Sequence, residues 1–206
     1  QIMPHRQLVE EIIIFTRYPE PGKVKTRLVP FLGKEETALM HRRLSEQIIR
    51  QVKLVPETRP VLISLFYSGG SLKQMKNWLK YPFIYEKQQG ADIGIRMAAA
   101  FQSAWKRGRK RAVLIGTDCP LMNAGLLDEA LDKLLVNDVV LGPANDGGYY
   151  LIGLHDDLPA GQLDSLFVNI AWGSADVFRQ TVNRARKYNL RIATLEQLHD
   201  IDRVED

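Results

Sequence analysis

The chain has one cysteine, Cys119, and no long apolar run. A single cysteine cannot form a disulfide within the chain, which is typical of proteins from a reducing compartment. No stretch approaches the roughly 18 consecutive apolar residues of a membrane span, and residues 1–11 lack the apolar centre of a signal peptide. These absences predict a cytoplasmic protein without a membrane partner.

Two nucleotide-binding fingerprints are also missing. Gly22-Lys23 is followed by valine, so there is no GxxxxGK[ST] sequence, and there is no GxGxxG sequence. Neither a P-loop nor a Rossmann-type dinucleotide site is therefore predicted. Histidine gives little support to a catalytic triad or a zinc site, because all four histidines lie outside the loops considered below: His5, His41, His155 and His199.

Positive charge is in only slight excess, with 28 Lys and Arg against 24 Asp and Glu and a formal net charge of +4. A nucleic-acid-binding domain usually concentrates more positive charge, whereas a small excess also suits a protein that binds small phosphorylated ligands. The run KRGRKR at 106–111 resembles a nucleic-acid patch, but it follows a predicted helix, whose C-terminus favours cations. We interpret it as a solvated connector and expect no nucleic-acid partner.

What the chain does contain is sufficient for one folded domain. It has 206 residues, 45% of them hydrophobic and 25% charged, which is long enough to bury a core without a disulfide or a structural metal. It contains no repeat, no low-complexity stretch and no long linker. We expect a single domain over residues 1–206.

Short apolar runs alternate with segments of helical period along the chain. Strands that are apolar throughout, alternating with helices, are typical of an α/β fold with a mostly parallel sheet flanked by helices. The segment 155–170 is the least periodic, and we interpret it as a lid or a specificity loop. The expected strands are 11–15, 60–66, 83–87, 111–116, 138–142, 149–154 and 190–195, and the expected helices are 32–52, 71–80, 92–108, 123–136 and 174–188.

The loop after the first strand is basic. In open parallel sheets, ligands bind outside the carboxyl ends of the strands, and four cations at such a place suit a di- or triphosphate. Gly22 lets the backbone approach a ligand closely. The alternative is a solvated basic turn. The cations of this loop are Arg17, Lys23, Lys25 and Arg27.

Two later strands are followed by an aspartate. Asp118 follows the run 111–116 and precedes a proline. A carboxylate at the end of a buried strand is well placed to bind a divalent cation, because Mg²⁺ prefers one or two carboxylates together with substrate phosphates. The alternative is that Asp118 caps a turn. Asp146 precedes Gly147 and Gly148, which predicts a hairpin that carries this carboxylate to the site.

A polar turn precedes the third predicted helix. It contains Gln89, Gly90 and Asp92 and is suited to contact a nucleoside, although Asp92 also reads as an ordinary helix N-cap. Cys119 lies beside Asp118, and we interpret it as a small buried side chain rather than a nucleophile.

Four segments together resemble a known bacterial family: FTRYPEPGKVKTRL (15–28), QQGADIGIRM (88–97), LIGTDCP (114–120) and GPANDGGYYLIGL (142–154). They are similar to transferases labelled radical-SAM/selenodomain-associated, or arsenosugar-type glycosyltransferases, in the nucleotide-diphospho-sugar transferase superfamily with its glycosyltransferase-A fold. The segments 166–178 and 198–206 also match. The superfamily includes molybdenum-cofactor and phospholactate nucleotidyltransferases, which share the basic loop and the acidic metal position.

The resemblance implies a role for each segment. The loop around Gly22 resembles a phosphate-binding loop, Asp118 has the position of the metal-binding aspartate, and Asp146 lies in an acidic motif on the acceptor side or at a second metal. Cys119 stands where serine is frequent, and Gly173-Ser174 stands where Ser-Thr is usual. The implied ion is Mg²⁺ or Mn²⁺, and the residues implied to bind substrate are Arg17, Gly22, Lys23, Lys25, Arg27, Gln89, Gly90, Asp92, Thr117, Gly147 and Gly148.

Three functions follow as hypotheses. The first is a metal-dependent transferase that uses a nucleotide sugar and an unknown small-molecule acceptor. The second is a nucleotidyltransferase that uses a nucleoside triphosphate and releases pyrophosphate. The chain lacks the glycine-rich LxGGxxxRMGxxK loop of many nucleotidyltransferases, which favours the glycosyl version, although phospholactate-type members also lack it. The third is a non-catalytic nucleotide-binding module.

Overall fold

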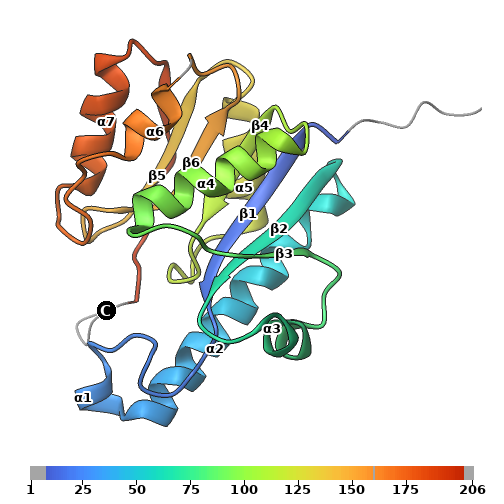
Figure 1. The fold of residues 1–206 in the computed structure, drawn as a ribbon, viewed down its shortest axis with the longest axis vertical. Coiled ribbons are helices and arrows are strands. Elements are labelled where there is room, and N and C mark those ends of the chain that lie inside the picture. The colour runs from blue at the N-terminus through green and yellow to red at the C-terminus, as the bar shows by residue number, and fades with distance from the viewer. Residues whose placement is uncertain (1–7, 160, 202–206) are drawn as a thin grey trace, which may run out of the picture.

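The computed structural model describes residues 8–159 and 161–201 (Figure 1). The last five residues of the matching segment 198–206, and His5, lie outside the described residues. The strands are β1 (Glu10–Arg17), β2 (Val61–Ser68), β3 (Ile84–Lys87), β4 (Arg111–Ile115), β5 (Val139–Pro143), β6 (Tyr149–His155) and β7 (Ile192–Thr194). The helices are α1 (Val29–Leu32), α2 (Lys34–Val52), the 3₁₀ turn η1 (Val55–Glu57), α3 (Leu72–Leu79), α4 (Ile93–Lys106), α5 (Ala124–Lys133), α6 (Gln162–Phe167) and α7 (Val177–Lys187).

The strands of the described chain form one sheet in the order β3-β2-β1-β4-β6-β5-β7. Strand β6 is antiparallel to both of its neighbours, and the other pairs are parallel. The loops that follow β1, β4 and β5 therefore leave the sheet at the same edge, which we call the carboxyl edge. Figure 1 shows β1 ending at this edge, on the side where α1 lies.

Helices cover both faces of the sheet, as predicted. Alternate residues of β1 point to opposite faces, so Ile12 and Ile14 pack into one buried cluster while Ile13 and Phe15 pack into the other. The first cluster takes its helical side chains from α2, α3 and α5, and the second takes them from α4, α6 and α7. Each fully buried isoleucine contributes about 1.5–3 kcal/mol, which explains why a run of three isoleucines forms an internal strand.

The sequence prediction of segment 155–170 is wrong in part, because α6 lies within it. Leu166 and Phe167 of this helix are buried, and the Phe167 ring stacks on Phe101 of α4 with centroids 6.3 Å apart. A helix of six residues has fewer than two turns, so its period does not stand out in the sequence. Two aromatic contacts tie it to the core, the second from Phe167 to Trp172.

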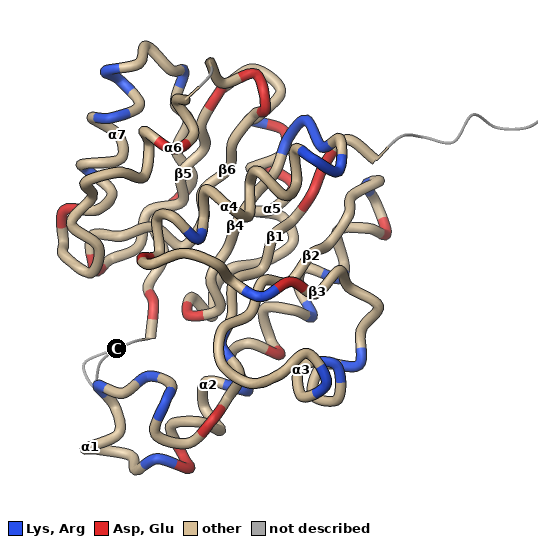
Figure 2. Tube along the Cα trace, viewed as in Figure 1, with Lys and Arg blue, Asp and Glu red and all other residues tan. Residues whose placement is uncertain are grey.

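The connector 106–111 lies at the opposite edge of the sheet and is not a free basic surface. Arg107 binds the buried Glu11 and also Glu86, while Arg111 Nε donates to Glu10 Oε1 at 3.0 Å. Figure 2 shows the basic connector beside the acidic start of β1. These cations neutralise buried carboxylates, which gives them a structural role.

Among the described helices, none combines the length and the apolarity that a bilayer span requires.

Candidate functional site

The basic loop after β1 is tightly curled. Gly22 has φ +74°, and the Arg17 Nη1 atom donates to the Lys23 carbonyl at 2.9 Å. Lys23 points to the surface, where its ammonium lies 2.8 Å from the Glu20 carboxylate and 65% of its side chain is exposed. The predicted cations of this loop thus do not converge on one point, and Lys23 neutralises a neighbour in the same loop.

Lys25 points the other way, into the protein. Its side chain is only 4% exposed, and its Nζ atom lies 2.5 Å from Asp118 Oδ1. Lys25 has φ +43°, in the left-handed region that a residue with a Cβ enters at a cost of about 1–2 kcal/mol. The structure therefore brings together a phosphate-loop cation and the predicted metal-binding aspartate, and it does so through a strained backbone.

Asp146 lies on the predicted hairpin between β5 and β6. Its Oδ1 atom accepts a hydrogen bond from the Gly148 backbone N–H at 2.8 Å. Gly147 has φ +89°, and a Cβ atom there would lie 2.1 Å from the Ala175 carbonyl oxygen. Gly147 is thus covered by the chain that precedes α7, which gives it a packing role in this structure.

Cys119, beside Asp118, is buried. Burial, followed by the negative charges of Asp200, Asp118 and Asp146, raises the pKa of this thiol to about 12. The side chain is 5% exposed. The interpretation of Cys119 as a small buried side chain therefore agrees with its position.

Asp200 was not among the residues predicted for the site. It lies on residues 195–201, which we call the C-terminal strap. The strap runs along β5 and then to the loop after β4: Leu198 N–H donates to the Pro143 carbonyl at 3.0 Å, and Ile201 N–H donates to the Asp118 carbonyl at 2.9 Å. The Lys25 ammonium also donates to the Ile201 carbonyl. The match of 198–206 to the family pattern was the sequence signal for this segment.

Two histidines contact the site loops, although both lie outside them in the sequence. His199, on the strap, is 2.9 Å from the Asn145 amide through its Nε2 atom. His41, on α2, donates from Nε2 to the Arg17 carbonyl at 2.9 Å. Burial lowers the pKa of His41, so the ring is neutral at neutral pH and supports the backbone of the basic loop.

Three hydroxyl groups lie beneath the site. Thr117 Oγ1 is 3.2 Å from Thr16 Oγ1 and 3.1 Å from Ser45 Oγ, and the Thr16 and Ser45 hydroxyls are 3.1 Å apart. All three residues are buried. The predicted substrate-binding residue Thr117 therefore uses its hydroxyl inside the protein, where it fixes the ends of β1 and β4 relative to α2.

The predicted nucleoside-binding turn has local structural bonds. Asp92 caps α4, because its Oδ1 atom accepts from Ile95 N–H at 2.8 Å. Gly90 has φ +138°, and its carbonyl accepts from Arg96 Nε at 2.9 Å. Gln89 lines a cavity of about 290 Å³ between β3 and α4. None of the residues lining that cavity belongs to the group around Asp118.

A second acidic group lies elsewhere. His155, Asp156 and Asp157 offer ligand atoms that are all within 4.8 Å of one another. His155 pairs with Arg111 at the start of β4, so this group lies at the edge of the sheet opposite to Asp118. Asp156 already binds the Lys110 ammonium at 2.7 Å. We do not assign the site to this group.

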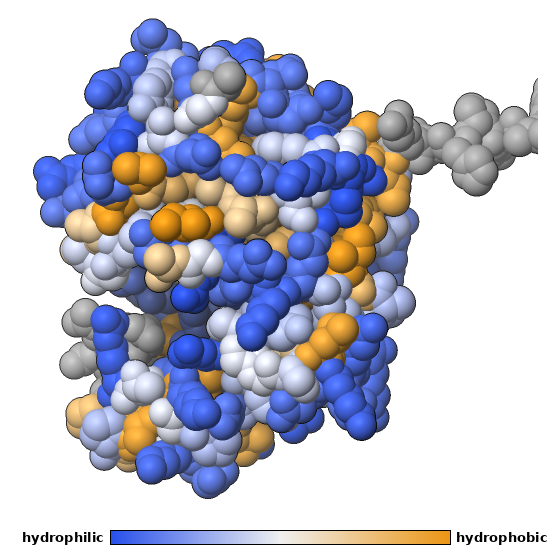
Figure 3. All heavy atoms as spheres, in the orientation of Figure 1, coloured by the Kyte–Doolittle hydropathy of each residue, from blue (hydrophilic) through white to orange (hydrophobic). Residues whose placement is uncertain are grey.

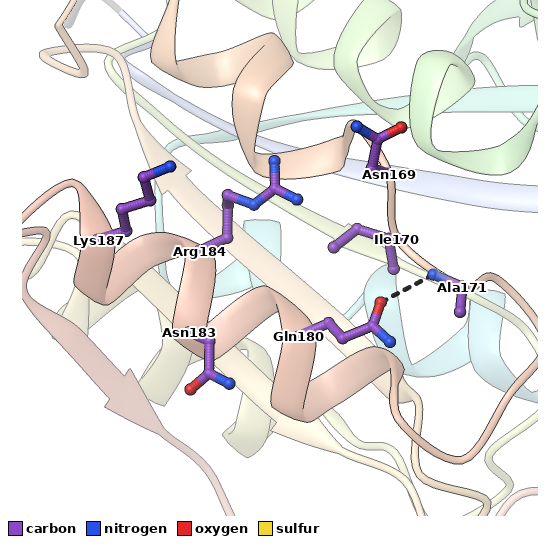
Figure 4. A pocket seen from close by; sticks show the side chains of 7 residues that line it. All are labelled: Asn169, Ile170, Ala171, Gln180, Asn183, Arg184 and Lys187. Atoms are coloured by element: carbon purple, nitrogen blue, oxygen red, sulfur yellow. Dashed lines mark hydrogen bonds between the residues drawn. The ribbon is translucent and has the colours of Figure 1, made fainter.

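A cavity of about 540 Å³ lies beside α7 (Figure 4). Arg184 and Lys187 line it, and Gln180 Oε1 accepts from Ala171 N–H at 2.9 Å. Both cations lie in the last turn of α7, where they complement the helix dipole. The two cations therefore have a structural role that needs no ligand, and we place the functional site at the carboxyl edge. Figure 3 shows the surface hollowed between the part that holds α1 and the part that holds α4.

Comparison with known proteins identifies a family and proteins of similar fold. The family described as "Uncharacterized protein conserved in bacteria (DUF2064)" matches residues 51–174. A solved protein from Desulfovibrio desulfuricans G20, provisionally named a nucleotide-diphospho-sugar transferase, is 35% identical, with a TM-score of 0.83 over 96% of this chain and 84% of that one. The comparison with curated proteins found no match.

More distant structures share the fold. The 4-diphosphocytidyl-2C-methyl-D-erythritol synthase from Anaerococcus prevotii is 10% identical, with a TM-score of 0.64 over 97% of this chain and 93% of that one. The inositol-1-phosphate CTP transferase from T. maritima is 11% identical, with a TM-score of 0.55 over 97% of this chain and 91% of that one. At these identities the likeness shows the α/β fold, which the sequence also predicts.

Proposed function

The chain belongs to the DUF2064 family of bacterial proteins, and from that premise we propose that it is a metal-dependent transferase that uses a nucleotide sugar. Its relative of 35% identity carries the name of nucleotide-diphospho-sugar transferase. The observation that carries the proposal is the pairing of Lys25, from the loop after β1, with Asp118, from the loop after β4, at the carboxyl edge. A cation at the carboxyl edge suits the diphosphate of a nucleotide sugar, and a carboxylate beside it suits the metal ion that accompanies such phosphates.

The chemistry of the Asp118 carboxylate suits a divalent ion. Carboxylate oxygens are the ligands that Mg²⁺ and Mn²⁺ prefer, and Asp118 is 51% exposed, so its outer oxygen is accessible. Asp118, with Asp146 as a second carboxylate, would hold the ion, and phosphate and water oxygens would complete its coordination. When bound, the ion would supply charge neutralisation to the phosphate groups of the nucleotide.

The basic loop supplies the second part of the chemistry. Transfer from an activated nucleotide leaves negative charge on the departing phosphate, and positioned cations stabilise that charge in the transition state. Lys25 is the cation that the loop directs inward, so it binds the phosphate nearest to Asp118. Such reactions depend on positioning and electrostatics rather than on covalent help from the protein, and the buried hydroxyls of Thr16, Ser45 and Thr117 hold the two loops in place.

Two alternatives use the same site. A nucleotidyltransferase would bind a nucleoside triphosphate and release pyrophosphate, and the resemblance supports it because the nucleotidyltransferases of the superfamily share the basic loop and the acidic metal position. The absence of the LxGGxxxRMGxxK loop and the resemblance to arsenosugar-type transferases favour the glycosyl version. A binding module without turnover is the third candidate. The released product separates the three candidates. A glycosyltransferase releases a nucleoside diphosphate, a nucleotidyltransferase releases pyrophosphate, and a binding module releases neither.

A thermal-shift screen tests the proposal. Nucleotides and nucleotide sugars are each added with and without Mg²⁺ or Mn²⁺. A ligand at 100 times its Kd stabilises by about 2.7 kcal/mol, which raises the Tm of a chain of this size by about 5–10 °C. We expect a shift that requires the metal. If no nucleotide produces a metal-dependent shift, the proposal is wrong.

Two aspartate variants locate the metal. Asp118→Asn should abolish the metal dependence of the shift, because it removes one ligand charge. Asp157→Asn is the matched control, since it changes an exposed aspartate in the acidic group at the opposite edge and should leave the shift unchanged. The reverse result would move the metal site to residues 155–157.

A further inference from the structure

The resting position of Lys25 has a consequence for metal binding. Its ammonium lies 2.5 Å from Asp118 Oδ1 and also donates to the Ile201 carbonyl. The side chain is 4% exposed, and the backbone has φ +43°. A strained and buried lysine is thus held at an aspartate that is itself half-exposed, and the ammonium occupies one side of the carboxylate on which a divalent ion would bind.

A lysine and a divalent cation compete for such a carboxylate. Each requires the negative charge of Asp118, and their mutual repulsion is strong at the separations of a shared ligand. The ammonium is buried, so it cannot leave its place unpaired without a large cost. A phosphate group gives it another anion to bind. The loop around Lys25 is the element that the proposed function assigns to phosphate.

We propose that Lys25 is a competitive gate for the metal: its ammonium occupies Asp118 Oδ1 in the ligand-free protein and must leave before a divalent ion binds that oxygen and gains its full affinity. This inference rests on the proposed metal site at Asp118. It predicts an order of events in which a phosphorylated ligand draws Lys25 away and the metal then binds with high affinity. It also couples the strap to the ligand, because the same movement breaks the bond from Lys25 to the Ile201 carbonyl.

The neutral variant Lys25→Met tests the gate with Mn²⁺ alone, without nucleotide. Isothermal titration calorimetry, or the electron paramagnetic resonance signal of free Mn²⁺, measures the affinity. We expect Lys25→Met to bind Mn²⁺ at least 10-fold more tightly than the wild type. Lys25→Arg keeps the positive charge and should stay within about two-fold of the wild type. Lys23→Met removes an exposed charge that pairs with Glu20, and it should also leave the affinity unchanged.

A double variant tests whether Lys25 affects Mn²⁺ affinity through Asp118. Adding Asp118→Asn to Lys25→Met should remove the gain in affinity, because the gain arises at Asp118. Circular dichroism and a melting curve check that each variant is folded, and Lys25→Arg repeats the comparison with a side chain of similar length. Folded Lys25→Met with wild-type or weaker affinity overturns the gate.

Failure of the gate and failure of the proposed function give different results. If Mn²⁺ binds the wild type tightly, Asp118→Asn abolishes that binding and Lys25→Met changes nothing, the gate is wrong while the metal site stands. If Asp118→Asn leaves Mn²⁺ binding intact in every background, the metal is not at Asp118, and both proposals are wrong.

Discussion

Replacement of Gly147 by alanine perturbs the contact between the hairpin of Asp146 and the chain that precedes α7. Gly147 has φ +89°, which costs a residue with a Cβ about 1–2 kcal/mol. The added carbon would lie 2.1 Å from the Ala175 carbonyl oxygen and 2.5 Å from the Ala175 carbonyl carbon. Both are backbone atoms, so the hairpin and the loop must move apart.

The size of the effect follows from these two costs. Overpacking of a buried contact costs about 1–3 kcal/mol, which gives about 2–5 kcal/mol in total with the backbone term. For a chain of this size, each kcal/mol lowers Tm by about 2–4 °C. The hydrogen bond from Phe178 N–H to the Gly147 carbonyl, at 2.9 Å, is expected to break in the same rearrangement.

Gly148→Ala is the matched control. A Cβ atom there would meet the Asp146 Oδ1 atom at 3.1 Å, which is the end of a side chain that can rotate. Urea denaturation of both variants measures the free energy of unfolding. We expect a loss of at least about 2 kcal/mol for Gly147→Ala and a smaller loss for Gly148→Ala. Equal losses, or a Gly147→Ala variant as stable as the wild type, would refute the reasoning.

Three further predictions concern titratable groups. Burial and nearby carboxylates raise the pKa of Cys119 to about 12, so a disulfide reagent at pH 8 should react with it only after denaturation; rapid reaction of the native protein contradicts this. Glu11→Gln removes the buried partner of Arg107 and should lower the free energy of unfolding by about 3–5 kcal/mol. Glu20→Gln removes one partner of an exposed pair and should lower it by less than about 1 kcal/mol. Urea denaturation of both variants measures the difference. Burial lowers the pKa of His41 in the folded protein, so below the ordinary histidine pKa of about 6.5 the unfolded state binds more protons than the folded state, and the free energy of unfolding should fall from pH 7 to pH 5. His41→Gln should flatten this pH dependence. An unchanged pH dependence in His41→Gln excludes His41 as its source.

The inner strands were predictable because they are short apolar runs that are buried between the two layers of helices, whereas the outer strands β3 and β7 are only half-buried. The clearest case is β1, whose three isoleucines are fully buried. The order of the strands was not predictable, since register and neighbours depend on contacts between distant residues. Helix α6 was missed for a different reason: its six residues bury only Leu166 and Phe167, which is too few positions to show a period.

The site was predictable in its loops and not in its contacts. Asp118 and Lys25 follow predicted strands, so the sequence places both at the carboxyl edge, but nothing in it tells that the two side chains pair. Asp200 reaches the site only because the strap is hydrogen-bonded along β5. Lys25 and Ile201 are separated by 176 positions in the chain, and no local pattern connects positions that far apart.

The two edges of the sheet bind carboxylates with different cations, and the difference agrees with the assignment of function. At the edge of Glu11, Arg107 donates from both Nε and Nη2 to the two carboxylate oxygens. A planar arginine fork fixes geometry and stays charged, so this pair holds the sheet together. At the carboxyl edge, the single Nζ atom of Lys25 binds Asp118. An ammonium on a flexible four-carbon stem can turn from one anion to another, which is what a site that exchanges one anion for another requires.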